Sequence, residues 1–583
     1  MKHQALIFCT LALALILLSG GTGFAQHEGH DMSKMPGASK QKPKTAQKKK
    51  QPNEQKKDEM QGMDMKEMPA PSPSPTPSPE AAPTPEQQMN MPMPAQSPST
   101  EAAPVPSPAK AETPQSIPTT DTLQPQNAPG HVHPGMSNMK TDGAKSGAMK
   151  DSMPGMNMGS SSMGPMVLTS DKQMAIRVGA SESNTISMGQ MGSGTSWQPA
   201  STPMHMWYRV SGEWLLMFHG DVKIGVNAQG GERGVTKLES LSWFMPMAVR
   251  RAGPGTLQLR GMFSFEPFTF ARGGSPLLFQ TGETYKGQPL IDKQHPHDLF
   301  MELSASYTMP LGERGTWSTY FGFPGEPALG PVAFMHRASA SENPSAPLAH
   351  HLQDSTHIAF GVFTTGFTYR WLKLEGSIFN GHEPDENRYN FEFKPWDSRS
   401  ARLSFAPNNN WSMQLSYGFL RDPEALERGT TRRTTASVSY NKPFERGNWA
   451  TSIIWGRNHE TTEGGEVFNL NGYTAESTIN FFEKNYLYTR LELVDKNHLL
   501  RADDRARLGI AEDHPSFRIG AYTTGFARDI WTTDKLSIGL GMDVTFYSKP
   551  AILDDVYGNH PTSYRFFMRV RPAMMKMSGH SSH

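Results

Sequence analysis

The chain has 583 residues, and its 56 basic and 55 acidic side chains nearly cancel, so no net charge favours binding to nucleic acid. Its one cysteine, Cys9, lies in an N-terminal apolar stretch, which excludes disulfides and thiolate metal sites from the rest of the chain. Beyond that stretch we find no apolar run of about 18 residues, so a membrane-spanning helix is not expected. A water-soluble fold and a membrane β-barrel remain.

Residues 1–25 are typical of a secretory signal peptide. Lys2 gives a positive start, an apolar run extends to Leu18, and Gly23-Phe24-Ala25 supplies the small residues at which signal peptidase cuts. We therefore expect the protein to be exported and Cys9 to be removed.

Residues 26–166 form a low-complexity arm. A basic run covers 40–57, and 69–118 is dense in Pro, Ser, Ala and Thr. Aromatic and β-branched residues are scarce, so the arm cannot bury enough apolar surface to offset its ordering entropy. We expect it to be a disordered tether.

Methionine and histidine gather in clusters along this arm. Thioether sulfur suits Cu(I), and imidazole suits Cu(I) or Cu(II), so the clusters predict bound copper ions, with compositional drift as the alternative. The candidate ligands are His27, His30, Met32, Met35, Met63, Met65, Met68, His131, His133, Met136, Met153, Met156 and Met158. A tail at 573–583 is again rich in Met and His.

Two of these clusters support a resemblance. His27-Glu-Gly-His-Asp-Met-Ser-Lys-Met35 and Met63-Asp-Met-Lys-Glu-Met68 resemble the Met/His repeats of copper-resistance protein B. In that family such a segment precedes an outer-membrane barrel, which implies a periplasmic arm, metal tolerance and contact with periplasmic copper proteins. The later segments 294–298, 324–331 and 354–357 look more like those of uncharacterised bacterial envelope proteins. The copper resemblance therefore covers the arm and the architecture.

Residues 167–212 are predicted to be irregular, with 192–200 packed inside a barrel, and residues 213–572 are predicted to form that barrel. Short runs alternate apolar and polar residues, which is the period of strands with one apolar face. Each run is about ten residues long, enough for a tilted strand to cross a bilayer. We predict about 16 strands, with 14 to 18 compatible with the pattern, at 213–226, 238–249, 255–265, 298–309, 315–323, 355–369, 371–379, 397–405, 410–420, 432–441, 447–458, 467–482, 485–495, 515–527, 534–547 and 562–571.

The connections between these strands alternate between short turns and mostly longer loops, as in transmembrane barrels. Aromatic residues gather at strand ends on the short-turn side, as expected for an interfacial girdle: Trp214, Trp317, Trp371, Trp411, Trp449, Tyr486 and Trp531. The predicted fold class is therefore an all-β transmembrane antiparallel β-barrel in outer-membrane lipid, with its arm in the periplasm. A soluble sandwich, with the same stripes buried between two sheets, is the alternative.

Histidines of the barrel concentrate in the predicted long loops. A metal or substrate site for Cu(II), Zn(II) or Ni(II) is one interpretation, and loops that simply hold polar residues are the other. The candidate ligands are His295, His297, Asp298, His350, His351, Asp354 and His357.

Together these patterns favour copper binding, sequestration and tolerance, with transport as an addition. A porin-like channel for small solutes with an incidental arm is the alternative, and a surface adhesion protein is the third. Arg402, Arg490 and Arg569 are expected to face the lumen, either lining or filling it. The residues around His350, Asp354 and Ser355 imitate a hydrolase site but lack the His–x–Ser–Asn–Gly pattern of the outer-membrane phospholipases, so no enzyme is expected.

Overall fold

The computed structural model describes residues 165–168, 173–270, 273–354, 358–425 and 427–575. The predicted signal peptide, the candidate ligands of the arm, His357 and the end of the Met/His-rich tail lie outside the described residues, and what the sequence predicts for them stays a prediction. Within the described part, no helix combines the length and the apolar character needed to cross a membrane.

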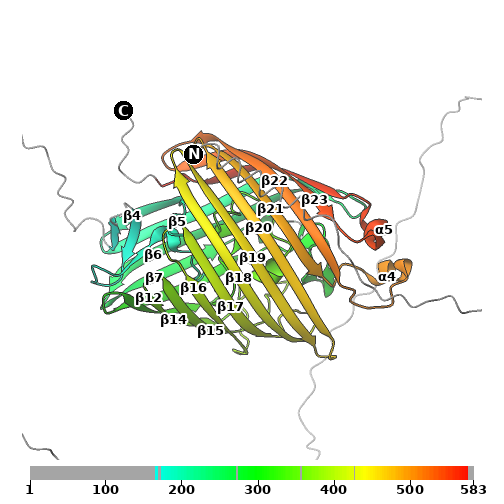
Figure 1. The fold of residues 1–583 in the computed structure, drawn as a ribbon, viewed down its shortest axis with the longest axis horizontal. Helices are drawn as coiled ribbons and strands as arrows, with labels where there is room; N and C mark the ends of the chain where they lie inside the picture. The colour runs from blue at the N-terminus through cyan, green and yellow to red at the C-terminus, as the bar shows by residue number, and fades with distance from the viewer. Residues whose placement is uncertain (1–164, 169–172, 271–272, 355–357, 426, 576–583) are drawn as a thin grey trace, which may run out of the picture. The chain divides into compact units, whose positions relative to one another are not determined.

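The described chain forms a closed antiparallel β-barrel of 16 strands, which confirms the predicted fold class (Figure 1). Each strand pairs with the next along the chain, and the barrel closes where β24 pairs with β5, from Val570 opposite Val222 to Tyr564 opposite Ala228. The strands are β5 (Trp214–Ala228), β6 (Thr236–Ala252), β7 (Gly255–Phe263), β12 (Phe300–Leu311), β13 (Gly315–Gly322), β14 (Val362–Tyr369), β15 (Leu372–Phe379), β16 (Ser398–Phe405), β17 (Trp411–Arg421), β18 (Gly429–Phe444), β19 (Gly447–Thr462), β20 (Val467–Phe481), β21 (Asn485–Lys496), β22 (Phe517–Thr532), β23 (Leu536–Ser548) and β24 (Thr562–Pro572).

Several short elements precede the barrel. β1 (Met166–Leu168), β2 (Met174–Arg177) and β3 (Thr185–Ser187) form a small antiparallel sheet, followed by the 3-10 turn η1 (Met188–Gln190). β4 (Met206–Ser211) then pairs with the first residues of β5, next to the place where β24 ends. Residues 167–212, expected to be irregular, therefore contain short strands, and β4 extends the last position of the barrel wall.

The barrel wall has apolar side chains outside and polar side chains inside. On β17, Leu415 and Tyr417 are 54% and 50% exposed, whereas Ser416 between them is 2% exposed. Charged side chains are buried on the inner face of many strands, including Arg260, Glu302, Glu375, Arg402, Arg433, Glu476, Arg490, Arg565 and Arg569. A soluble sandwich would bury the apolar stripes, so this polarity indicates a wall that faces lipid.

Most of the predicted girdle lies on the outer surface. Trp317, Trp371, Trp411, Trp449 and Trp531 are exposed, and Trp214 is half-buried. Tyr486 does not belong to the girdle: its side chain is buried, and its ring lies under the guanidinium groups of Arg569 and Arg571, at 4.8 and 4.9 Å. These inward-facing cations, far away in the sequence, stabilise the inward orientation of the ring.

Short turns gather at one end of the barrel, called here the short-turn end, and long loops at the other, the long-loop end. Figure 1 shows helices α4 and α5 at the long-loop end. An exception is the connection of β19 to β20, residues 463–466, which is short although it lies at the long-loop end. The loops carry α2 (Glu266–Thr269), β8 (Ser275–Pro276), β9 (Glu283–Tyr285), β10 (Gln288–Leu290), β11 (Lys293–Gln294), η2 (Phe334–His336), α3 (His350–Gln353), α4 (Ala502–Leu508), η3 (Ala551–Leu553) and α5 (Asp554–Tyr557).

The long loops share a hydrophobic core over the barrel mouth. Leu278, Leu352, Leu499 and Val556, from four different loops, are buried in one cluster. The ring of Phe279 stacks on that of Tyr557 in the same cluster, with centroids 4.3 Å apart. Apolar burial across loops holds the mouth in a defined shape, which positions the side chains described next.

Candidate functional site

The described part of the connection between β13 and β14, residues 323–354 and 358–361, lies inside the barrel; we call it the folded-in loop. Its Arg337 donates through Nε to Glu476 Oε2 of β20 at 3.0 Å. From the wall, Arg490 donates to the carbonyl of Ser345 at 2.6 Å, and Arg402 donates to that of Gly330 at 3.1 Å. The loop is therefore bound to inward-facing charges on β16 and on the neighbouring strands β20 and β21.

Glycines on the inner wall make room for this loop. A Cβ atom at Gly456 of β19 would lie 2.1 Å from the carbonyl oxygen of Leu352, and one at Gly418 of β17 would lie 2.7 Å from Leu329 Cδ2. A side chain at Gly456 would displace the loop, so this glycine serves close approach of two backbones, whereas Gly418 leaves room for the side chain of Leu329.

Residues 188–203, the inner segment, contact the inner wall at other points. Arg260 of β7 donates through Nη1 to the carbonyl of Gly192 at 3.0 Å, and Arg402 of β16 donates to Thr195 Oγ1 at 2.8 Å. Lys373 of β15 donates to the carbonyl of Thr195. Three wall cations therefore bind consecutive parts of one short segment.

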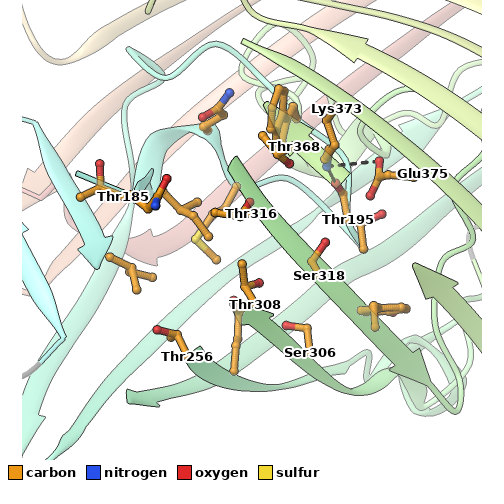
Figure 2. Close-up of a pocket in the computed structure, with 18 of the residues that line it drawn as sticks. Thr185, Thr195, Thr256, Ser306, Thr308, Thr316, Ser318, Thr368, Lys373 and Glu375 are labelled. Atoms are coloured by element: carbon orange, nitrogen blue, oxygen red, sulfur yellow. Dashed lines mark hydrogen bonds and ion pairs between the residues drawn. The ribbon is translucent and has the colours of Figure 1, made fainter. Parts of the chain in front are cut away.

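A cavity of about 340 Å³ lies between this inner segment and the wall of β7, β12, β13, β14 and β15 (Figure 2). Figure 2 shows hydroxyl-bearing side chains around it, and it extends to Arg314 and Arg370 in the short turns. Its wall hydroxyls are Thr256, Ser306, Thr308, Thr316, Ser318, Thr364 and Thr368. The sequence analysis singled out none of these residues, although each is a small polar residue on the inner face of a strand.

The inward-facing cations of the strands near the cavity are paired with carboxylates, whereas Arg314 and Arg370 lie in the short turns at its edge. Lys373 lies 3.2 Å and Arg402 3.1 Å from Glu375, and Arg260 lies 3.0 Å from Glu302. These pairs leave a lining dominated by hydroxyl groups, which both donate and accept hydrogen bonds. Of the three arginines predicted to face the lumen, all are buried and ion-paired: Arg402 with Glu375, Arg490 with Glu476, and Arg569 with Asp529 and Glu342.

Three of the candidate loop histidines meet at the long-loop end. One ligand atom each of His295, His350 and His351 lies within 4.8 Å of the others. His295 follows β11, whereas His350 and His351 begin α3, so two loops supply the group. The ring centroids of His350 and His351 are 4.1 Å apart, and those of His295 and His351 are 6.2 Å apart. Neutral imidazoles at this spacing can hold a divalent transition metal ion.

Acidic side chains around this group orient its rings. Glu283 of β9 accepts from His295 Nε2 and, at 2.6 Å, from Arg388 Nη2. Burial opposes ionisation of Glu283, but its hydrogen bond with His295 and the charge of Arg388 hold the pKa of this carboxyl below its usual range. Burial lowers the pKa of His351 to about 3, which keeps that imidazole neutral despite the nearby Glu283. Carboxylate partners of this kind fix the orientation of metal-binding imidazoles.

The remaining candidate loop residues have other partners. His297 Nδ1 lies 2.8 Å from Glu266 Oε2, Asp298 accepts from Arg388 at 3.2 Å, and Asp354 accepts from Arg337 at 3.2 Å. Asp354 therefore binds the folded-in loop's own arginine. The sequence analysis missed Glu283 and Arg388, because their role appears only when β9 and the loop after β15 come together.

A second group lies among loops of the same end. Glu427 carboxylate oxygens are 3.4 Å from His498 Nε2 and 3.3 Å from His514 Nε2. None of these three residues is among the candidate loop ligands of the sequence analysis. All three side chains are only half-buried, so this group is open to solvent.

Comparison with solved structures finds several barrels of low sequence identity. The anion-selective porin of Comamonas acidovorans is 10% identical over 62% of this chain and 100% of the porin, with a TM-score of 0.36. OmpT, an outer membrane protein of Vibrio cholerae, is 8% identical over 63% of this chain and 100% of its own, with a TM-score of 0.36. OpdK of Pseudomonas aeruginosa, solved with vanillate, is 10% identical over 62% of this chain and 99% of its own, with a TM-score of 0.34.

No family model and no curated protein matches the chain. The resemblance of the arm to copper-resistance protein B therefore has no support from these comparisons. The predictions of bound copper, of metal tolerance and of a chain that is not an enzyme stay predictions.

Proposed function

We propose that the protein is a porin-like barrel of the outer membrane that passes small polar solutes. The observation that carries this proposal is the hydroxyl-lined cavity of about 340 Å³ between the inner segment and the wall. The folded-in loop, bound to the wall through Arg337 and Glu476, narrows the path above the cavity.

The lining favours solutes that carry hydroxyl or amide groups. Ser306 and Ser318 offer donors and acceptors along the wall, while the nearby cation Lys373 is paired with Glu375. The paired charges of the strands exert little long-range pull on ions, so short-range hydrogen bonding along the wall selects what enters. We therefore expect small neutral polar molecules, of the size of a monosaccharide, as the preferred solutes.

Two neighbouring residues of β12 allow a matched test. Ser306 lines the cavity, whereas Ala305 is exposed on the outer face. Ser306→Trp should fill part of the cavity and slow the swelling of proteoliposomes in a monosaccharide solution at least threefold. Ala305→Trp places the same ring against lipid and should leave the swelling rate unchanged. Wild-type vesicles that swell no faster than protein-free ones, or equal rates for both variants, would exclude the proposed path.

Metal capture at the mouth is a second candidate function. The observation that favours it is the group of His295, His350 and His351, supported by the carboxylate of Glu283 behind one ring. Imidazole ligands suit Cu(II), Zn(II) or Ni(II). In this account the predicted arm would add copper binding on the periplasmic side, as its resemblance implies.

This candidate is tested by titrating the purified full-length protein with Zn(II). We expect His295→Ala/His351→Ala to lose one bound ion per chain, because a single remaining imidazole does not hold the metal. His459→Ala serves as control, since His459 contacts Asn469 on the exposed side of β19 and is not part of the group. Equal stoichiometry in the wild type and the double variant would show that the group holds no metal.

A further inference from the structure

Methionines form a continuous cluster inside one side of the barrel. Nine of them are buried in it, and four more are half-buried against it. The cluster begins at the short-turn end with Met204 and Met206 and reaches the long-loop ends of β7 and β12 at Met262 and Met301. Its other members are Met166, Met174, Met188, Met191, Met217, Met245, Met247, Met335 and Met575.

Histidines lie among these thioethers. His336, from η2 of the folded-in loop, places its Nε2 atom 3.3 Å from Met262 Sδ. His219 of β5 is opposite Met206 on one side and opposite Met245 on the other. A cavity of about 120 Å³ between the wall and the folded-in loop is lined by His219, His336, Met245 and Met335.

We propose that a soft monovalent cation, Cu(I) or Ag(I), binds at the edge of this cavity, between His336, which lines it, and Met262, which lies behind His336, and that these two residues are its first ligands. Met245, Met335 and His219 complete the ligand set by small rotations of their side chains. This inference goes beyond the passage of polar solutes, and it uses residues that neither the arm nor the mouth group contains.

The chemistry of the donors decides the class of ion. Thioether sulfur is soft and carries no charge, and it prefers Cu(I) to the harder divalent ions. The nearby carboxylates are already paired: Asp221 lies 2.8 Å from Lys223, and Glu342 lies 2.8 Å from Arg571. A neutral ligand set therefore faces the cavity, and such a set suits one positive charge better than two.

Apolar packing alone is the alternative account of the cluster. Methionine fills irregular gaps in hydrophobic cores. Packing does not, however, explain imidazoles of two different elements at thioethers beside an open cavity. His336 also contacts the edge of Trp243, another residue that lines the cavity, with ring centroids 4.4 Å apart, so the orientation of its ring is fixed.

The test is an Ag(I) titration of the purified full-length protein in detergent, in competition with a chelator. We expect Met262→Leu/His336→Gln to bind one tight ion fewer per chain than the wild type, while the ions bound by the arm are the same in both. The matched control is Met542→Leu/His459→Gln, which changes a lipid-facing methionine, 54% exposed, and a histidine at the barrel edge. This control should bind as many ions as the wild type.

Two further measurements separate loss of the proposed Ag(I) site from misfolding of the double variant. Met262→Leu alone nearly conserves side-chain volume, and we expect it to weaken the binding of that ion at least tenfold even if the double variant does not fold. Zn(II) stoichiometry should be the same in the wild type and in Met262→Leu. Unchanged Ag(I) binding in a folded variant would overturn the proposal, as would a parallel loss of Zn(II). Solute flux through the barrel is measured separately, so the two proposals can fail independently.

Discussion

Glu326 lies in the folded-in loop, and its side chain is buried beside the inner wall. Burial, followed by the charge of Glu302, raises the pKa of Glu326 to about 8. The other charged groups that face it are Arg260, which lowers this pKa, and Asp354, which raises it. At neutral pH the carboxyl is therefore largely protonated, and the loop lies against the wall without an unpaired buried charge.

A pH-dependent opening follows from this raised pKa. Because the folded protein holds the proton more tightly than the unfolded chain, the stability that this group contributes is complete below pH 4.5 and is lost as the pH rises through about 8. An ionised Glu326 beside Glu302 should release this part of the loop. We expect single-channel conductance to rise between pH 7 and pH 9 and to stay constant in Glu326→Gln. The same rise in both proteins would place its origin elsewhere.

At the scale of elements, the folded-in loop depends on glycines in the strands that it contacts. Gly456 is buried on β19, and Gly376 is a half-buried glycine on the opposite, outer face of β15. The carbonyl of Leu352 occupies the place where a side chain of Gly456 would lie. Strand and loop therefore fit each other only while this position has no side chain.

Gly456→Val tests this fit. Valine favours strands, so the barrel should form, but its side chain overlaps the backbone of Leu352 and costs the docked loop about 1–3 kcal/mol. We expect a larger conductance and faster trypsin cleavage after Arg337 than in the wild type. Gly376→Val carries the same change on the lipid side, where the nearest other atom is 3.8 Å away, and should behave like the wild type. Equal behaviour of the two variants would mean that the loop does not rest on β19.

The 16 strands could be predicted because alternation of apolar and polar residues is local. The alternation of Leu415, Ser416 and Tyr417 indicates which of these side chains face outward, and no other part of the chain is needed to predict it. The methionine cluster could not be predicted in the same way. The run Trp214-Leu-Leu-Met-Phe218 is apolar on both faces, so the sequence does not tell that Met217 faces the lumen and Leu216 the lipid.

The candidate site was predicted only in its residue types. The sequence placed His295, His350 and His351 in two loops, and the structure brings them together. Asp354, three residues after His351, binds Arg337 instead, because that arginine comes from elsewhere in the folded-in loop. Contacts between residues distant in sequence bring the three histidines together and pair Asp354 with Arg337. The amino-acid sequence alone does not show these contacts.

At the scale of the whole molecule, the barrel has its charges inside and its apolar residues outside. Arg569 and Glu476 are almost fully buried on the inner wall, whereas Ile453 and Phe566 are 66% and 58% exposed on the outer one. The apolar outer surface is compatible with contact with lipid, and paired charges stabilise the segments that fill the lumen. The narrowed solute path and the cation site beside His336 both require the folded-in loop to lie inside this barrel.

A disulfide tests that placement most directly. Ser339 of the folded-in loop donates to Ser452 Oγ on β19 at 2.8 Å, and the chain has no cysteine after Cys9. We predict that Ser339→Cys/Ser452→Cys, oxidised in isolated outer membranes, forms an intramolecular disulfide in most chains, seen as a mobility shift that a reductant reverses. A pair of Ser339→Cys with Ser304→Cys, on β12 of the wall, should stay reduced. If the first pair cross-links no more than the second, the loop lies outside the lumen and the account is contradicted.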